Sequence, residues 1–352
     1  MRIKLTVVVF VAFTMYCECS SLQMKGEIHH PVTIDDWPLT IEHFPAAEGK
    51  PKKKFPILVC HGAGANREYF KAQNQDSLIA HLQKAGYDVW LMDLRGRPEA
   101  GPPGYWFGKH TYTYSMDDYI KEDLDTAIKF VLEKTGASKI NYIGHSMGGI
   151  IMHARLGSYA ENRVANFIAI ASPMHFAPYN QWMFTVYRMR DGMAILPVLP
   201  ASPSIAFASY LPFFSKNPLI RTVVNPNNID SEILNILARQ SINNMSKIEV
   251  RQFLHMTENS GIHSLDQKTN YRENLKNIHA PVLLIAGRRD ELADPLTVRD
   301  VYDRVASKDK SLLIFSRADG YIDDYGHTDL VIGKKAHIEV HPRIIDWLDK
   351  RN

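Results

Sequence analysis

The order of hydrophobic and polar positions predicts strands and helices in alternation. Six apolar runs have the continuity of buried parallel strands, at residues 55–62, 87–93, 139–144, 164–173, 281–290 and 311–316. Segments with helical spacing of apolar positions follow several of them, at 77–85, 115–135, 147–160 and 296–305, and a last helix is expected at about 342–348. The more polar segment 27–50 predicts an opening antiparallel strand or hairpin. This alternation predicts an α/β fold with a mostly parallel, doubly wound sheet and right-handed crossovers.

The alternation is interrupted once. Residues 173–280 begin with a stretch rich in methionine, aromatic residues and proline and continue as a polar segment with helical character. Insertions of this length usually shape or cover a site. We therefore predict a core in two parts, 22–172 and 281–352, with a cap or lid inserted at 173–280.

The N-terminus has the layout of a secretory signal peptide, which we place at residues 1–21. Arg2 and Lys4 precede an apolar run that is too short to span a bilayer, and small residues follow it. Cys17 and Cys19 stand near the expected cleavage point, so a lipoprotein leader is an alternative. Either reading predicts export: secreted, periplasmic, or at the cell envelope with peripheral or lipid-anchored membrane association. Cys60 is the third and last cysteine of the chain, so no intrachain disulfide is expected after cleavage.

Composition narrows the function classes. The chain has 352 residues, 45% hydrophobic and 22% charged, as in an ordinary globular protein. Its 41 basic and 38 acidic residues give a net charge of +3, which is too balanced to predict nucleic-acid binding. No GxGxxG motif, P-loop or zinc-ligand spacing is present, so we predict neither a cofactor nor a metal. Nothing in the sequence indicates an oligomeric state.

The stretch "YIGHSMGG" carries the strongest chemical signal. It places Ser146 between Gly144 and Gly148, at the junction of a predicted strand and a predicted helix. A turn this tight requires glycine where neighbouring backbone approaches, and it exposes the hydroxyl at the carboxyl edge of the sheet. We interpret the stretch as a nucleophile elbow. A glycine-rich turn without chemistry is the alternative.

A serine nucleophile needs a base, and the base needs an orienting carboxylate. In the order Ser, acid, His that this elbow predicts, Asp290 follows a buried strand directly, and Asp294 is its rival. His327 lies in a loop before the last helix and is the predicted base. His337 and His341 fall at or near that helix, where a surface or capping role is a better interpretation than a metal-ligand pair.

Two backbone amides are expected to bind the oxyanion of the tetrahedral intermediate. One is that of Met147, the residue after the nucleophile, and the other is that of Ala63, which stands between two glycines. We expect His61 and His145 to brace these two turns rather than to act in catalysis.

At this point the chain resembles the α/β-hydrolase family, and within it the members of the acid-lipase and esterase type. The matching stretches occur in family order over residues 55 to 348 and read "VCHGAGANREYF", "GYDVWLMDLRGR", "YIGHSMGG", "GRRDELADP" and "GHTDLVIGKKA". The resemblance implies Ser146 as nucleophile, Asp290 as acid and His327 as base. It also implies the Ala63 and Met147 amides as the oxyanion hole and the insertion as a lid.

The predicted function is a serine carboxylester hydrolase that acts on lipid or other lipophilic esters. Aromatic residues early in the insertion are candidates for the acyl pocket, namely Phe176, Trp182, Phe184 and Tyr187. Packing of the insertion onto the core is the alternative explanation for them. Other serine hydrolases of the same fold, such as peptidases, thioesterases or carbon–carbon bond hydrolases, fit the same triad, as does a non-catalytic binding protein on this scaffold.

Overall fold

The computed structural model describes residues 24–177, 198–199, 201–211, 214, 217–258 and 261–352. Within this part of the chain, eight strands form one sheet in the order β1-β2-β4-β3-β5-β6-β9-β10. The strands are β1 (Glu27–His29), β2 (Thr40–Phe44), β3 (Ile57–Cys60), β4 (Val89–Asp93), β5 (Ile140–His145), β6 (Val164–Ile170), β9 (Val282–Gly287) and β10 (Lys310–Phe315). β2 runs antiparallel to β1 and β4, and every other neighbouring pair is parallel. The predicted fold class is confirmed, including the antiparallel opening.

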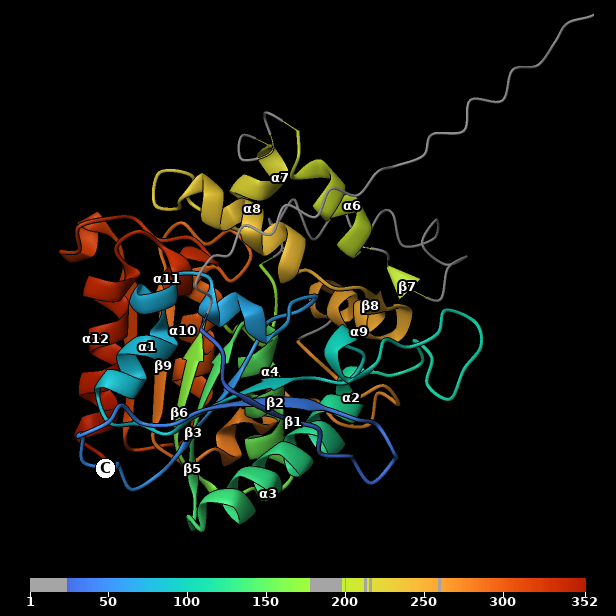
Figure 1. Ribbon diagram of the computed structural model, residues 1–352, viewed down its shortest axis with the longest axis horizontal. Coiled ribbons are helices and arrows are strands. Elements are labelled where there is room, and N and C mark those ends of the chain that lie inside the picture. The colour runs from blue at the N-terminus through green and yellow to red at the C-terminus, as the bar shows by residue number, and fades with distance from the viewer. Residues whose placement is uncertain (1–23, 178–197, 200, 212–213, 215–216, 259–260) are drawn as a thin grey trace, which may run out of the picture.

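Helices cover both faces of the sheet. α1 (Leu78–Lys84) packs beside α12 (Ala336–Asp349) on one side, and α3 (Leu124–Thr135) and α4 (Met147–Ser158) lie on the other (Figure 1). Two shorter elements, α2 (Met116–Asp118) and α11 (Asp329–Ile332), and the longer α10 (Pro295–Arg304) complete the core helices. Strands covered on both faces explain why the sequence reads as continuous apolar runs rather than as alternating ones.

The helix starts follow local signals in the sequence. Ser77 caps α1 by accepting the Ala80 N–H at 3.2 Å. Ser115 and Asp118 form a capping box at the start of α2, as their spacing predicts. The helical run from α2 to α3 passes through one π-helical turn, Tyr119–Asp123, which the apolar spacing does not reveal.

The last helix is longer than predicted. It begins at Ala336, so Pro342 lies inside it, whereas a proline normally marks a first turn. Ala336, Val340, Ile344 and Leu348 are all fully buried. Burial of this stripe outweighs the lost hydrogen bond at the proline, which is why the prediction from local signals was wrong.

Between β6 and β9 the chain leaves the large sheet. This segment holds α6 (Ala201–Ala208), α7 (Pro218–Arg221), α8 (Ser231–Gln240) and α9 (Lys247–Glu258), and a two-stranded sheet of β7 (Val198–Leu199) and β8 (Met245–Ser246). These elements lie together at one end of the molecule (Figure 1). We call residues 173–280 the insertion, and their division from the core at these boundaries stays a prediction.

The predicted signal peptide, with Cys17 and Cys19, lies outside the described residues. Among the helices that the structure describes, none combines the length and the apolar character required to cross a membrane. Cys60 is fully buried in β3, and burial raises the pKa of its thiol to about 12.

Candidate active site

Ser146 occupies a strained turn between β5 and α4. Its backbone has φ 52° and ψ −118°. Residues other than glycine rarely adopt such a positive φ, and this conformation costs about 1–3 kcal/mol. The Ser146 N–H donates to the Ile170 carbonyl of β6 at 2.8 Å, which ties the turn to the sheet. The serine therefore stands at the carboxyl edge of the sheet and at the N-terminus of a twelve-residue helix, whose dipole favours negative charge.

The glycines around the serine are required by close backbone approach. A Cβ on Gly144 would lie 2.4 Å from the Gly149 nitrogen, and a Cβ on Gly148 would lie 2.4 Å from the Cys60 carbonyl oxygen. Both distances are far below any normal contact, and both neighbours are backbone atoms that cannot rotate away. Gly144 and Gly148 let the helix start directly against the strand, as the sequence pattern predicts.

The loop after β3 passes directly against this turn. A Cβ on Gly62 would lie 3.1 Å from the Ser146 Cβ and 3.3 Å from the His145 Nδ1, so only glycine allows this approach without displacement. Ala63 follows in this loop, and Met147 begins α4. Among the described residues, neither the Ala63 nor the Met147 amide donates to a backbone carbonyl. Both N–H groups are thus available where the two turns meet.

The structure brings Asp290 and His327 together. Asp290 follows β9, His327 lies between β10 and α11, and the His327 Nδ1 is 2.8 Å from the Asp290 Oδ2. The other carboxylate oxygen, Oδ1, accepts the N–H groups of Leu292 and Ala293 at 2.9 and 2.7 Å. Both side chains are nearly inaccessible to solvent. The carboxylate is therefore held by three hydrogen bonds and fixes one edge of the imidazole.

The other residues considered for the acid or the base lie elsewhere in the fold. Asp294 caps α10 by accepting the Leu296 N–H at 2.7 Å. His341 is completely buried in α12, where its Nε2 lies 2.9 Å from the Val331 carbonyl, and burial lowers its pKa to about 3. Of the surface or capping role expected for His341, the surface part is wrong, because the helix starts earlier and turns this face inward. His337 lies in the first turn of the same helix and is half-buried.

His145 and His61 brace the two turns, as expected. The His145 Nε2 lies 3.2 Å from the His327 backbone carbonyl, so the residue before the serine contacts the loop that carries the predicted base. The His61 Nε2 accepts the Leu94 N–H at 3.3 Å. Burial lowers the pKa of both rings well below 6.5, and the positive charge of Arg97 acts in the same direction at His61. Both rings are therefore neutral and act as hydrogen-bonding supports.

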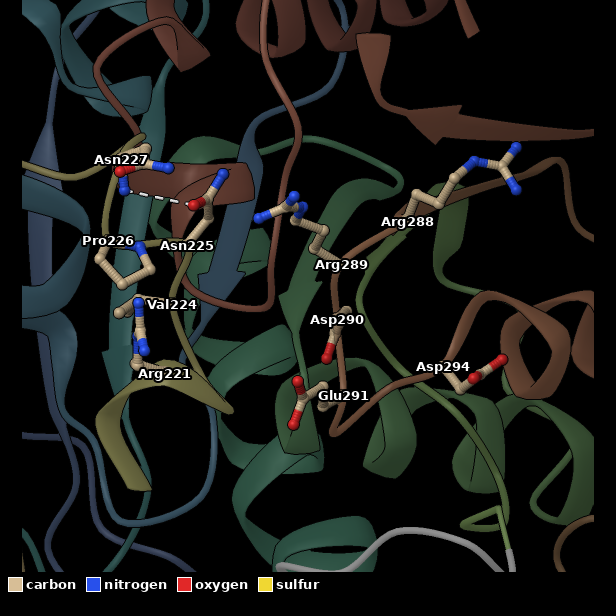
Figure 2. Close-up of a pocket in the computed structure, with 10 residues that line it drawn as sticks. All are labelled: Arg221, Val224, Asn225, Pro226, Asn227, Arg288, Arg289, Asp290, Glu291 and Asp294. Atoms are coloured by element: carbon tan, nitrogen blue, oxygen red, sulfur yellow. Dashed lines mark hydrogen bonds between the residues drawn. The ribbon is translucent and has the colours of Figure 1, made fainter. Parts of the chain in front are cut away.

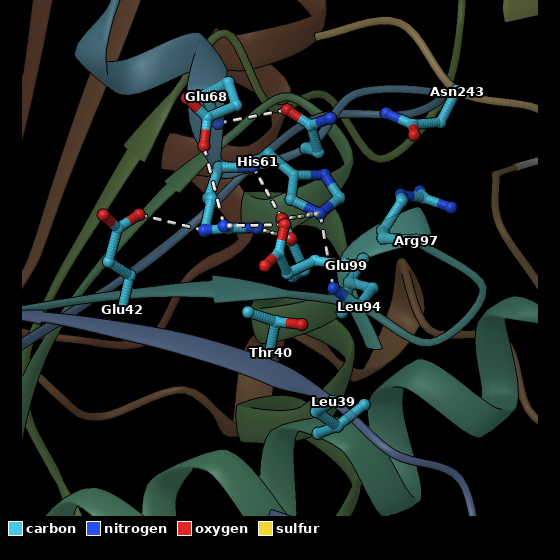
Figure 3. A network of polar contacts seen from close by, with 12 residues as sticks. Leu39, Thr40, Glu42, His61, Glu68, Leu94, Arg97, Glu99 and Asn243 are labelled. Atoms are coloured by element: carbon cyan, nitrogen blue, oxygen red, sulfur yellow. Dashed lines mark hydrogen bonds and ion pairs between the residues drawn. The ribbon is translucent and has the colours of Figure 1, made fainter. Parts of the chain in front are cut away.

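A buried network of charges supports the loop after β3 (Figure 3). The Arg67 side chain contacts Asp93 at 2.6 Å and Glu42 at 2.9 Å, and Lys71 contacts the same Glu42 oxygen at 2.7 Å. Asp93 also accepts the Arg67 N–H at 2.6 Å. Burial raises the pKa of Asp93, and Arg67 opposes this. The network ties the 3-10 turn Arg67–Lys71 to β2 and β4 beneath the loop.

Arg97 and the insertion hold the same loop from its other side. The buried Arg97 donates from Nε to the Ala65 carbonyl at 2.6 Å. The Asn243 N–H of the insertion donates to the Gly64 carbonyl at 2.6 Å. Within the described residues, Nη1 and Nη2 of Arg97 and both carboxylate oxygens of Glu249 in α9 are buried without a hydrogen-bond partner. Burial raises the pKa of Glu249, and the positive charge of Arg97 lowers it.

Asp329 joins the insertion to the loop of His327. Its carboxylate accepts the Gly326 N–H at 2.9 Å, the Asn225 N–H at 3.0 Å and the Asn228 side chain at 3.1 Å. Burial raises its pKa to about 6, while the hydrogen bonds from Asn225 and Gly326 lower it. The roles of Asp329 and Arg97 could not be predicted from the sequence, because both act through contacts between segments far apart in the chain. Their one local signal is a charged side chain within an otherwise apolar or glycine-rich stretch.

A cavity of about 590 Å³ opens beside Asp290. In Figure 2, Arg221 and Asn225 from the insertion face Arg289, Asp290 and Glu291 from the core. This lining is charged, whereas an acyl pocket is mostly apolar. The cavity is therefore a polar space next to the Asp290–His327 pair rather than a place for a hydrocarbon chain.

The residues proposed for an acyl pocket are only in part described. Phe176 is buried, and its ring stacks with that of Phe253 in α9 at a centroid distance of 6.3 Å. This contact packs the start of the insertion, and a substrate role for Phe176 stays a prediction. Trp182, Phe184 and Tyr187 lie outside the described residues. Among the described residues, the one histidine and carboxylate group compact enough for a metal ion comes from β1 and β2, not from the loops of Ser146 and His327.

Comparisons with known proteins agree with this architecture. A family described as alpha/beta hydrolase fold matches residues 56–332, which is more than half of the chain. A tear acid lipase-like protein of Mesocricetus auratus is 25% identical over 376 residues, covering 92% of this chain and 87% of that protein. Human lipase member K is 25% identical over 368 residues, and the match covers 92% of this chain and 88% of that protein.

Solved structures show the same fold at lower identity. A soluble variant of the monoglyceride lipase of Saccharomyces cerevisiae, in complex with a substrate analogue, superimposes with a TM-score of 0.64 at 18% identity. The match covers 94% of this chain and 96% of that one.

Proposed function

This chain belongs to the α/β-hydrolase fold family, and from that premise we propose that it is a serine carboxylester hydrolase acting on lipophilic esters. The observation that carries the proposal is the 2.8 Å contact between His327 and Asp290 at the edge of the sheet where Ser146 occupies a strained turn. A packed core has no need of a strained serine, two amides that donate to no backbone carbonyl and a buried carboxylate–imidazole pair at one place. Acyl transfer needs all of them.

The proposed reaction begins with the Ser146 hydroxyl. Because Asp290 holds the Nδ1 edge of His327, the lone pair of the neutral ring is on Nε2, which takes the serine proton as Oγ attacks the ester carbonyl. Asp290 stabilises the imidazolium that forms. The Ala63 and Met147 amides bind the oxyanion, and the α4 dipole adds to their effect.

The intermediate then collapses to an acyl-enzyme. The imidazolium gives its proton to the departing alcohol, and the ester C–O bond breaks. Water enters, His327 removes its proton, and a second tetrahedral intermediate releases the carboxylic acid and restores Ser146. Each of these steps uses side chains and amides of this chain alone.

The substrate class is supported by the relatives rather than by a described pocket. Proteins named as lipases align over about nine-tenths of this chain, and a similar solved structure is that of a monoglyceride lipase. Lipophilic carboxylic esters are therefore the proposed substrates. Peptidases, thioesterases and carbon–carbon bond hydrolases remain the alternatives, since the pocket selects the leaving group and the triad does not. We also propose that the protein is exported, because its N-terminal sequence has the layout of a secretory leader.

The test is hydrolysis of p-nitrophenyl esters of increasing chain length, together with labelling by a fluorophosphonate probe. We expect ester hydrolysis and one labelled serine. The Ser146→Ala variant is no longer labelled, and its kcat is about 10⁴-fold or more lower than that of the wild type. Ser158→Ala, at the far end of the same helix, is the matched control and keeps both. Labelling that survives in Ser146→Ala, or a folded wild-type protein without activity on any ester, contradicts the proposal.

A further inference from the structure

Two histidines and a glutamate lie on one face of the first two strands. Strands β1 and β2 are antiparallel, with Glu27 directly opposite His43 and His29 opposite Ile41. Side chains two residues apart on a strand share a face, and directly opposed residues also share one. Glu27, His29 and His43 are therefore neighbours on the same face. One possible ligand atom from each lies within 4.8 Å of the others.

His29 has the properties of an available ligand. Its Nε2 is buried and has no hydrogen-bond partner among the described residues, although the Glu27 Oε1 lies 3.6 Å away. Buried imidazole nitrogens normally have a partner, and an orphaned one requires an explanation. A neutral imidazole with such a nitrogen is the form that binds metal ions.

His43 is held in place by its surroundings. Its Nε2 lies 2.6 Å from the Oδ1 of the buried Asp88, and its ring stacks on Trp90 at 3.9 Å and 14°. When Asp88 accepts the Nε2 proton, the lone pair of the ring is on Nδ1. Metal-binding histidines usually donate their other N–H to a carboxylate in this way, which fixes the tautomer and increases the basicity of the ligand.

We propose that Glu27, His29 and His43 bind one late first-row transition-metal ion, most readily Zn²⁺, with solvent completing the coordination. Two imidazoles and one carboxylate form an established zinc ligand set, and imidazole disfavours Ca²⁺ and Mg²⁺, which prefer oxygen. Glu27 is 71% exposed at its side chain, so it can move to close the site and leaves a side open to water.

The proposed ion joins the edge strand β1 to β2. β1 has only three residues and one neighbouring strand, so a metal clip there stabilises the weakest strand of the sheet. The sequence predicts no metal, because these ligands come from two strands and show no compact spacing. This site is independent of the proposed hydrolase activity.

The direct test is calorimetric titration of the full chain with Zn²⁺ after treatment with EDTA and dialysis. We expect one ion per chain, with affinity reduced more than about tenfold in Glu27→Gln and His29→Gln, and about 10- to 100-fold in Asp88→Asn. His30→Gln is the matched control, because His30 directly follows β1 but is not one of the three ligands, and its Nδ1 lies 3.3 Å from the Leu39 carbonyl instead. It binds as the wild type does.

Thermal unfolding gives a second measurement. Zn²⁺ raises the Tm of the wild type and of His30→Gln, but not that of Glu27→Gln, whose exposed side chain can be replaced without disturbing the fold. Substituted Co²⁺ shows the visible absorption of a tetrahedral nitrogen and oxygen site. The proposal is overturned if the wild type takes up no stoichiometric Zn²⁺. It is also overturned if Glu27→Gln and His29→Gln bind Zn²⁺ as tightly as the wild type.

Discussion

The Nδ1 of His327 lies 2.8 Å from the Oδ2 of Asp290, across 37 positions of sequence. The contact is nearly shielded from solvent, and two backbone N–H groups hold the second carboxylate oxygen. A carboxylate in this arrangement cannot rotate away from the imidazole. The pair is therefore preorganised, and the predictions below concern the groups that keep it and the neighbouring loops in place.

Replacing Asp290 tests the orientation of the imidazole. Asp290→Asn keeps the shape of the side chain but presents a donor or a neutral acceptor to Nδ1, and we expect kcat to fall about 10⁴-fold. Asp294→Asn is the matched control. Asn caps a helix as well as Asp, so α10 and the activity are retained. Steady-state kinetics on a p-nitrophenyl ester measure both variants, and equal losses in the two would contradict the assignment.

Replacing Gly62 tests whether catalysis needs the close approach of the loop after β3 to Ser146. Gly62→Ala places a methyl group 3.1 Å from the Ser146 Cβ, so the loop must move by a few tenths of an ångström. We expect kcat to fall about 10²-fold, because the Ala63 amide no longer meets the oxyanion in line. Circular dichroism should show an intact fold. An unchanged kcat would mean that this loop does not take part in catalysis.

Replacing Arg97 tests whether its hydrogen bond to the Ala65 carbonyl holds the loop after β3 in place. Lys in place of Arg97 keeps the charge but lacks the Nε–H that donates at 2.6 Å. We expect Arg97→Lys to lower kcat about 10-fold or more, with KM nearly unchanged, because positioning rather than binding is lost. A purely structural role would lower only the Tm, and that result would exclude a positioning role.

Asp329 is expected to make stability depend on pH. Its pKa is raised from 3.8 to about 6 in the folded protein, mainly by burial. The folded state therefore holds this proton more tightly than the unfolded state. The contribution of Asp329 to the free energy of unfolding decreases by about 2 kcal/mol as pH rises from about 4 to 6, and by about 3 kcal/mol in total between about pH 3 and 7.

The Asp329→Asn variant cannot titrate at this position. We expect its stability relative to the wild type to increase between pH 4 and 7, whatever the constant cost of its altered hydrogen bonds. Chemical denaturation at several pH values measures the difference in the free energy of unfolding. A difference that does not vary with pH would show that Asp329 is not the titrating group.

Local sequence signals accounted for much of the fold. The strands, the helix starts at Ser77 and Ser115, and the glycine spacing around Ser146 all follow from short-range rules of backbone geometry, capping and burial. The exceptions arose where long-range packing outweighed a local rule. The last helix begins before Pro342 because its apolar stripe is buried, and the same shift places His341 in the interior.

The sequence by itself determined the parallel sheet and the strained serine turn, because each depends on residues within a few positions of one another. Only the tertiary structure decided that Arg97 and Asp329 support the two loops, and that Glu27, His29 and His43 converge. The physical reason is that these contacts join strands and loops far apart in the chain. Their distances depend on the closure of the whole sheet, which no local pattern of residues encodes.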